Sequence, residues 1–126
     1  MSTLFIATSK PPELDEAANY RIDPLEYIRL MKLRWPYAKV VFVNNEYYEY
    51  NWELNQHDRL GLLGGLQSNR LVVSFNSNPH EDVIEFILWH RDFVPTDIPL
   101  FLFNTNLGLL YELRPKVTGQ DLASLF

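Results

Sequence analysis

The sequence predicts a single α+β domain over residues 1–126, with a mostly antiparallel sheet of about six or seven strands. Two main helices and a short C-terminal helix are expected to cover this sheet. Strand-like runs follow one another across short turns rich in Asn, Ser and Gly, which is typical of antiparallel hairpins. Two helix-like segments interrupt these runs, and the resulting order β-α-β-β-β-β-α-β-β-α lacks the regular alternation of a parallel sheet. A length of 126 residues fits one domain.

The chain is expected to open with a strand and a helix. The apolar run Thr3–Ala7 predicts a buried strand, which the prolines at positions 11 and 12 would end. Asp23 is an N-cap acceptor, Pro24 suits the first helical position, and Pro36 would end the helix. Its apolar positions near helical spacing are Leu25, Ile28, Met31 and Trp35. Residues 13–22, between these two elements, are ambiguous between a helical turn and an irregular segment.

A hairpin is expected next, from a strand over 38–43 and a second strand over 47–54. The second strand alternates, which is typical of a strand with one buried and one solvated face. The face expected to be buried consists of Tyr48, Tyr50, Trp52 and Leu54. The face expected to be solvated consists of Tyr47, Glu49, Asn51 and Glu53.

The second half of the chain repeats these patterns. Runs over 60–66 and 71–75 predict another hairpin, and Asn78-Pro79 repeats the helix-start pattern for a helix to about Phe93. At 100° per residue, one face of this helix holds Val83, Phe86, Ile87, His90 and Val94. A third hairpin over 99–103 and 108–113 follows, and Thr118 would cap the C-terminal helix.

Composition excludes several classes of function. The chain has no cysteine, which rules out disulfide frameworks, zinc–thiolate sites and thiol catalysis. A net charge of −5 disfavours nucleic acid and anionic membranes and modestly favours a basic partner. There is no signal-like N-terminus and no apolar stretch of membrane-spanning length, so we expect a cytoplasmic protein.

No pattern in the chain predicts catalytic residues, a metal site or a cofactor. His80, Glu81 and Asp82 are adjacent on a helix and point about 100° apart, so they would not converge on one metal. Gly61-Leu62-Leu63-Gly64-Gly65 lacks the Lys-Ser/Thr of a phosphate loop and predicts a bulge or space for large neighbours, such as the aromatic rings of the preceding strand. His90 is expected to be a neutral core histidine, bonded to a carbonyl or a strand tyrosine.

Three hypotheses of function remain open. The first is a non-catalytic domain that binds another protein through Tyr47, Glu49, Asn51 and Glu53. The second is a small-molecule-binding protein or enzyme with a pocket between the sheet and the second helix, lined by Tyr50, Trp52 and His90. The third is a homo-oligomer in contact through Trp89 and the sheet edge. In size, acidity and lack of catalytic motifs the chain resembles small bacterial toxin-neutralising or adaptor-like α+β proteins, which is an analogy of composition only.

Overall fold

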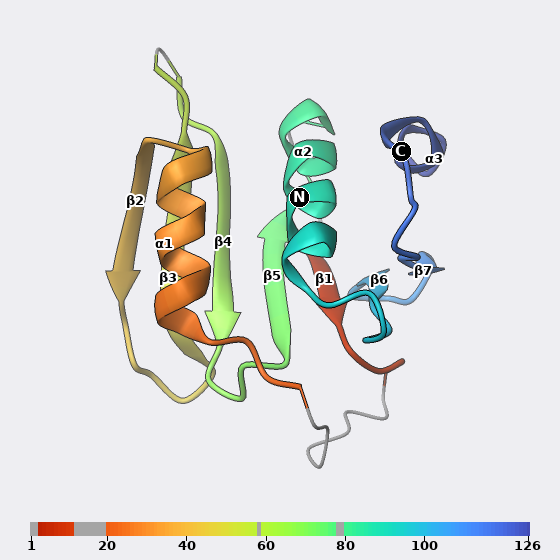
Figure 1. The fold of residues 1–126 in the computed structure, drawn as a ribbon, viewed down its shortest axis with the longest axis horizontal. Coiled ribbons are helices and arrows are strands. Elements are labelled where there is room, and N and C mark those ends of the chain that lie inside the picture. Colours follow the sequence, from red (N-terminus) through yellow and green to blue (C-terminus); the bar gives the residue numbers. More distant parts are fainter. Residues whose placement is uncertain (1–2, 12–19, 58, 78–79) are drawn as a thin grey trace.

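The computed structural model describes residues 3–11, 20–57, 59–77 and 80–126 and confirms the α+β class. These residues form one seven-stranded antiparallel sheet with three helices (Figure 1). The strands are β1 (Thr3–Ala7), β2 (Tyr37–Phe42), β3 (Tyr48–Asn55), β4 (Leu62–Gln67), β5 (Val72–Asn76), β6 (Phe101–Asn104) and β7 (Leu110–Glu112). The helices are α1 (Pro24–Arg34), α2 (His80–Phe93) and α3 (Gly119–Ala123). The order of elements along the chain is the predicted one.

The strand order in the sheet is β2-β3-β4-β5-β1-β6-β7. Among the described strands, four pairs that are consecutive in the chain are also neighbours in the sheet: β2–β3, β3–β4, β4–β5 and β6–β7. Strand β1 lies between β5 and β6, which follow it in the chain. Figure 1 shows α1 in front of β3 and α2 in front of β1, next to β5, on the same side of the sheet. The main core forms between these helices and the sheet face behind them, with Tyr27, Phe86, Trp52 and Phe75 among its largest side chains.

Helix α1 begins where predicted, and Met31 and Trp35 of the predicted stripe are buried, but Leu25 is not. The Asp23 side chain accepts a hydrogen bond from the backbone N–H of Leu25 (3.1 Å), and Pro24 follows the cap. The Leu25 side chain, however, is 73% exposed, whereas Tyr27 and Met31 are fully buried. Tyr27 and Met31 also have helical spacing, and Tyr27 occupies the core in place of Leu25. Its ring packs among aromatic residues, and its hydroxyl has a buried hydrogen-bond partner.

Helix α2 buries the predicted face, including Val83, Phe86, Ile87 and His90. The expected cap at Asn78-Pro79 and most of the ambiguous segment 13–22 lie outside the described residues. Thr118 caps α3 through a capping box, in which its hydroxyl accepts from the Asp121 N–H (3.1 Å) and the Asp121 carboxylate accepts from the Thr118 N–H (3.1 Å).

A bulge in β3 corrects the predicted assignment of its faces. The pairing register between β3 and β4 shifts between Tyr48 and Tyr50. Trp52 and Leu54 face the helices, as predicted, and both are 2% exposed. Tyr48 lies on the other face, where its hydroxyl is 2.8 Å from the Ser74 hydroxyl. A bulge adds one residue to a strand and so inverts the alternation beyond it, which a simple period of two does not anticipate.

The C-terminal end of α2 is held by a buried guanidinium that sequence analysis did not single out. Arg91 is 2% exposed. Its two terminal nitrogens donate to backbone carbonyls of Ile98 (3.1 Å), Leu113 (3.0 Å), Val94 (3.2 Å) and Pro95 (2.8 Å). The side chain therefore ties the helix to the 94–98 turn and to the residue that follows β7. Charged donors make the stronger class of protein hydrogen bonds, so this cluster fixes the helix end firmly.

None of the helices among the described residues has the length and apolar character that a bilayer crossing requires.

Candidate functional site

The sheet face opposite the helices is the candidate site, and we call it the open face. It consists of the strand side chains that alternate with the core residues, and no described helix covers it (Figure 1). Its members on β2 to β5 include Lys39, Val41, Tyr48, Asn51, Glu53, Leu63, Gly65, Ser74 and Asn76. Val41 and Leu63 are 57% and 40% exposed. Exposed apolar side chains on a broad face, with polar groups between them, are typical of a binding surface.

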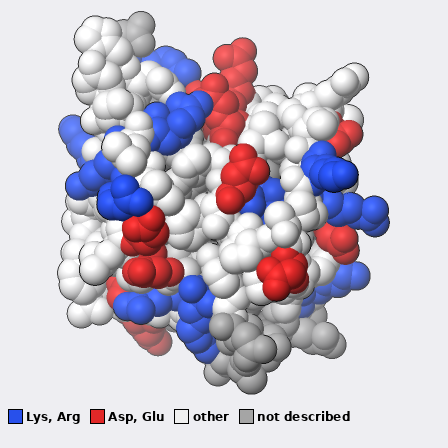
Figure 2. All heavy atoms as spheres, viewed as in Figure 1, with Lys and Arg blue, Asp and Glu red and all other residues white. Residues whose placement is uncertain are grey.

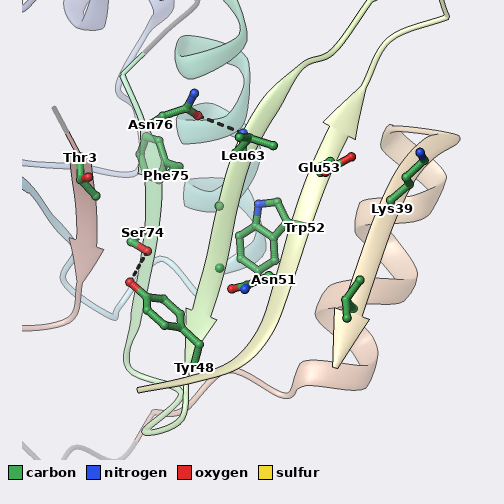
Figure 3. Close-up of a pocket in the computed structure, with 13 residues that line it drawn as sticks. Thr3, Lys39, Tyr48, Asn51, Trp52, Glu53, Leu63, Ser74, Phe75 and Asn76 are labelled. Carbon is green, nitrogen blue, oxygen red and sulfur yellow. Dashed lines mark hydrogen bonds between the residues drawn. The ribbon is translucent and has the colours of Figure 1, made fainter. Parts of the chain in front are cut away.

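A groove of about 520 Å³ crosses the open face (Figure 3). Its lining comes from β1, β2, β3, β4 and β5. Figure 3 shows Lys39 on the β2 side and Thr3 and Asn76 on the opposite side, with Asn51 and Tyr48 between them. Because no single loop builds the groove, its shape depends on the sheet being intact.

Two adjacent glycines make room for side chains of β3, Gly65 on the open face and Gly64 on the core face. A Cβ atom at Gly65 would lie 2.6 Å from the Asn51 side-chain oxygen and 2.9 Å from the Tyr48 ring. A Cβ atom at Gly64 would lie 2.6 Å from the Trp52 Nε1 and 2.6 Å from the Ser74 carbonyl oxygen. Aromatic side chains of β3 thus occupy space that β4 side chains would otherwise fill, as the glycine-rich stretch predicts.

Hydrogen bonds fix several polar groups around the groove. Tyr48 and Ser74 share a hydroxyl–hydroxyl hydrogen bond of 2.8 Å. The Asn76 side-chain oxygen accepts from the backbone N–H of Leu63 (2.9 Å), which leaves its amide N–H₂ to donate elsewhere. Two strands therefore hold each of these side chains, so the groove presents preorganised polar groups rather than mobile ones.

The four residues predicted to bind a partner do not form one continuous patch. Asn51 and Glu53 line the groove. Tyr47 precedes β3 and is 68% exposed. Glu49 lies at the bulge, where its carboxylate accepts two hydrogen bonds from the Arg70 guanidinium (3.0 and 2.9 Å). The negative charge of Glu49 is therefore matched within the protein, and the open face is less acidic than the sequence suggests.

The remaining charges on the groove are also balanced. Lys39 and Glu53 occupy opposite positions in the β2–β3 register. On the helix side of the molecule, basic and acidic side chains are interspersed (Figure 2). The net charge of −5 thus acts at long range, whereas the groove itself offers one cation, one anion and neutral polar groups.

The second predicted set, Tyr50, Trp52 and His90, lies on the helix side. Tyr50 stacks on Phe42 with a ring separation of 5.1 Å, and Trp52 is in the core. His90 is 1% exposed, and its Nδ1 is 2.8 Å from the Tyr27 hydroxyl. Burial, and after it repulsion from Arg91, lowers the pKa of His90 to about 3. The imidazole is therefore neutral at pH 7, and its partner is a helix tyrosine rather than a strand tyrosine.

Trp89, the predicted self-contact, is partly buried among aromatic rings. Its ring lies 4.9 Å from that of Tyr27 and 5.3 Å from that of Trp35. This cluster joins the facing sides of α1 and α2. Much of the apolar surface of Trp89 is therefore used within the fold.

The groove is lined by neutral polar groups, apolar side chains, one cation and one anion. Within the described ranges, no three His, Asp or Glu side chains come together as metal ligands would. Lys39, Leu63, Ser74 and Asn76 line the groove and were not predicted as site residues, and Tyr48, which also lines it, was expected on the buried face. The adjacent glycines were the available signal, because residues without side chains in a strand mark a hollow that neighbouring strands must border.

Comparison with protein-family models, with curated proteins and with solved structures finds no match for this chain.

Proposed function

We propose that the protein is a non-catalytic binding domain that holds another protein against the open face of its sheet. The observation that carries the proposal is the uncovered face itself, where Val41 and Leu63 remain exposed beside the groove. A sheet face that is exposed to solvent is normally polar. Apolar residues that remain exposed there, beside ordered polar groups, favour a binding partner.

The composition of the groove indicates the chemistry of the partner. Asn51, Asn76 and the Tyr48–Ser74 pair offer neutral donors and acceptors, while Lys39 and Glu53 contribute opposite charges. The contact region of the partner is therefore expected to be apolar with neutral polar groups. The net charge of −5 favours a basic protein during approach rather than in the final contact.

A matched pair of substitutions tests the proposal. Leu63→Lys places a charge on the open face, and Leu33→Lys makes the same change on α1, where the leucine is 68% exposed. Affinity capture from cells of the source organism, with quantitative mass spectrometry, should recover a protein that binds the native chain and the Leu33 variant. We expect its recovery to fall at least about tenfold with the Leu63 variant. Equal recovery with both variants would refute the open face as the contact.

A small polar molecule in the same groove is the second candidate. A volume of about 520 Å³ is within the usual size of ligand sites, roughly 300–1,000 Å³. Asn51 and Asn76 would orient such a molecule. A thermal-shift screen of metabolites distinguishes the two functions: a compound that raises the melting temperature of the native chain but not of an Asn51→Ala variant would favour the small ligand.

A further inference from the structure

Strand β2 is an edge strand whose outer backbone is available for pairing. It lies at one end of the strand order, with β3 as its partner (Figure 1). The Val43 N–H donates to the Glu49 carbonyl (3.0 Å), and Val41 pairs with Asn51 in the same register. Because N–H groups alternate in direction along an antiparallel strand, those of Val40 and Phe42 point away from β3. Their N–H and C=O groups therefore form a short template for another strand.

The two edges of the sheet differ in how they resist pairing. Strand β7 has three residues, and the last of them, Glu112, forms an ion pair with Arg114 (3.4 Å). Strand β2 has six residues, of which only Lys39 is charged. Val41 and Phe42 are 57% and 58% exposed, on opposite faces of the strand. Short length and charge are the usual protections of an edge strand, and β2 largely lacks them.

We propose that a second copy of this chain pairs with β2 in antiparallel fashion, on a two-fold axis at Val41. The two copies would then form one continuous sheet. In this register Val41 faces Val41 of the second copy, and Phe42 faces Val40 of the second copy on the helix side. The outward N–H and C=O groups of Val40 and Phe42 bond to those of Phe42 and Val40 across the axis. An apolar pair at the centre and the covering of Phe42 supply the driving force.

Charge and hydrogen bonding select this register over its neighbour. With the axis at Val41, the two Lys39 positions are about 14 Å apart, which is beyond the Debye length of about 8–10 Å at ordinary salt. An axis at Val40 would bring them to about 8 Å. It would also require the N–H of Ala38, which already donates to the Trp35 carbonyl (3.0 Å).

Self-pairing also bears on the groove. Lys39 and Val41 belong to its lining, so the second copy would border the groove at its β2 side. Each groove would then have a rim made by both copies. The inference does not depend on the proposed function, because an open face can bind a partner with or without dimerisation. The two tests change different residues of the sheet, Leu63 for the open face and Val41 for the dimer.

An engineered thiol tests the axis directly. The chain has no cysteine, so Val41→Cys introduces a single thiol per copy. On this axis the two Val41 residues form a non-hydrogen-bonded pair. The Cα atoms of such an antiparallel pair are about 4.5 Å apart, within the range of a disulfide. Mild oxidation of V41C should give a disulfide-linked dimer, whereas L33C at the same concentration should remain mostly uncrosslinked. Equal crosslinking of the two variants would overturn the axis.

Light scattering over a concentration series tests the dimer in the native chain. We expect a concentration-dependent dimer, and V41K should raise its dissociation constant at least about tenfold because two ammonium groups would meet on the axis. Added salt should recover part of that loss, and V41I should retain the dimer. Circular dichroism checks that V41K is folded, and the thiol experiment decides the matter if it is not. A native chain that is monomeric at every concentration, or a dimer unaffected by V41K, would refute the inference.

Discussion

The glycine at position 64 offers a quantitative test of how β3 and β4 pack. Gly64→Ala adds one methyl group. Its carbon would lie 2.6 Å from the Ser74 carbonyl oxygen and 2.6 Å from Trp52 Nε1, closer than non-bonded atoms normally approach. Gly64 does not have a positive φ, so the backbone conformation itself would accept alanine. The cost is therefore steric, and it is resisted by β5 backbone that cannot rotate away.

The expected magnitude follows from this geometry. Overpacking of a well-packed interior costs about 1–3 kcal/mol, and the gain from replacing a strand glycine by alanine offsets about 0.5–1 kcal/mol of it. We expect a net loss of about 1–2 kcal/mol. With a urea slope of about 2 kcal/mol/M for a domain of this size, the unfolding midpoint should fall by about 0.5–1 M. Tryptophan fluorescence is the suitable probe, because Trp52 must move to admit the methyl group.

Gly119→Ala is the matched control. A Cβ atom there would lie 3.6 Å from the Ile84 side chain and 3.8 Å from the Leu88 side chain, which are ordinary contacts. Since Gly119 begins α3, alanine should leave stability unchanged or raise it by about 0.5 kcal/mol. If the Gly64 variant unfolds at the same urea concentration as the native chain, the close packing of Trp52 on β4 is wrong.

Three other predictions concern buried or paired ionisable groups. For His90, the pKa of about 3 in the fold lies below its unfolded value of 6.5, so only the unfolded state gains a proton between these values. The free energy of unfolding should therefore lose up to about 1.4 kcal/mol per pH unit as pH falls below 6.5, and a His90→Gln variant should lack this component; identical pH dependence would contradict the burial of a neutral imidazole. Arg91→Met leaves buried carbonyls without donors and should cost about 3–5 kcal/mol in urea unfolding, and a loss under 1 kcal/mol would show that solvent replaces the guanidinium. Glu49→Gln breaks a partly exposed pair with Arg70 and should cost about 0.5–1 kcal/mol at low salt; a cost that persists unchanged in 1 M salt would argue against an ionic origin.

The helices and strands of this fold are specified by local signals, so they could be predicted from the sequence. Asp23-Pro24 and Thr118 mark helix starts through short-range hydrogen bonds, and the structure has both caps. The helical face of α2 was also predicted, because its apolar residues leave only one stripe to bury. Such signals depend on neighbours a few residues apart, so a single sequence contains them.

Features set by distant contacts could not be predicted in the same way. The choice of Tyr27 over Leu25 depends on His90, which lies on another helix. The position of β1 between β5 and β6 depends on long-range pairing that no local pattern encodes. The groove needs side chains from five strands, and only the Gly64-Gly65 pair hints at it.

Charge pairing is another feature that the sequence does not reveal. Glu49 reads as a free acid beside aromatic residues, but Arg70, from the turn between β4 and β5, neutralises it. Alternation along β3 identifies which side chains point away from the helices, apart from the bulge, but says nothing of which of them already have partners.

The bulge between Tyr48 and Tyr50 divides β3 into two stretches whose side chains alternate out of step. The stretch from Trp52 onward is locked to the core, while the stretch before the bulge follows the turn at residues 44–47. Lengthening or shortening that turn by a residue can therefore be absorbed before it reaches Trp52. The packing of Trp52 is thereby separated from changes at the hairpin turn, and Tyr48 is the one groove-lining residue of β3 that lies before the bulge.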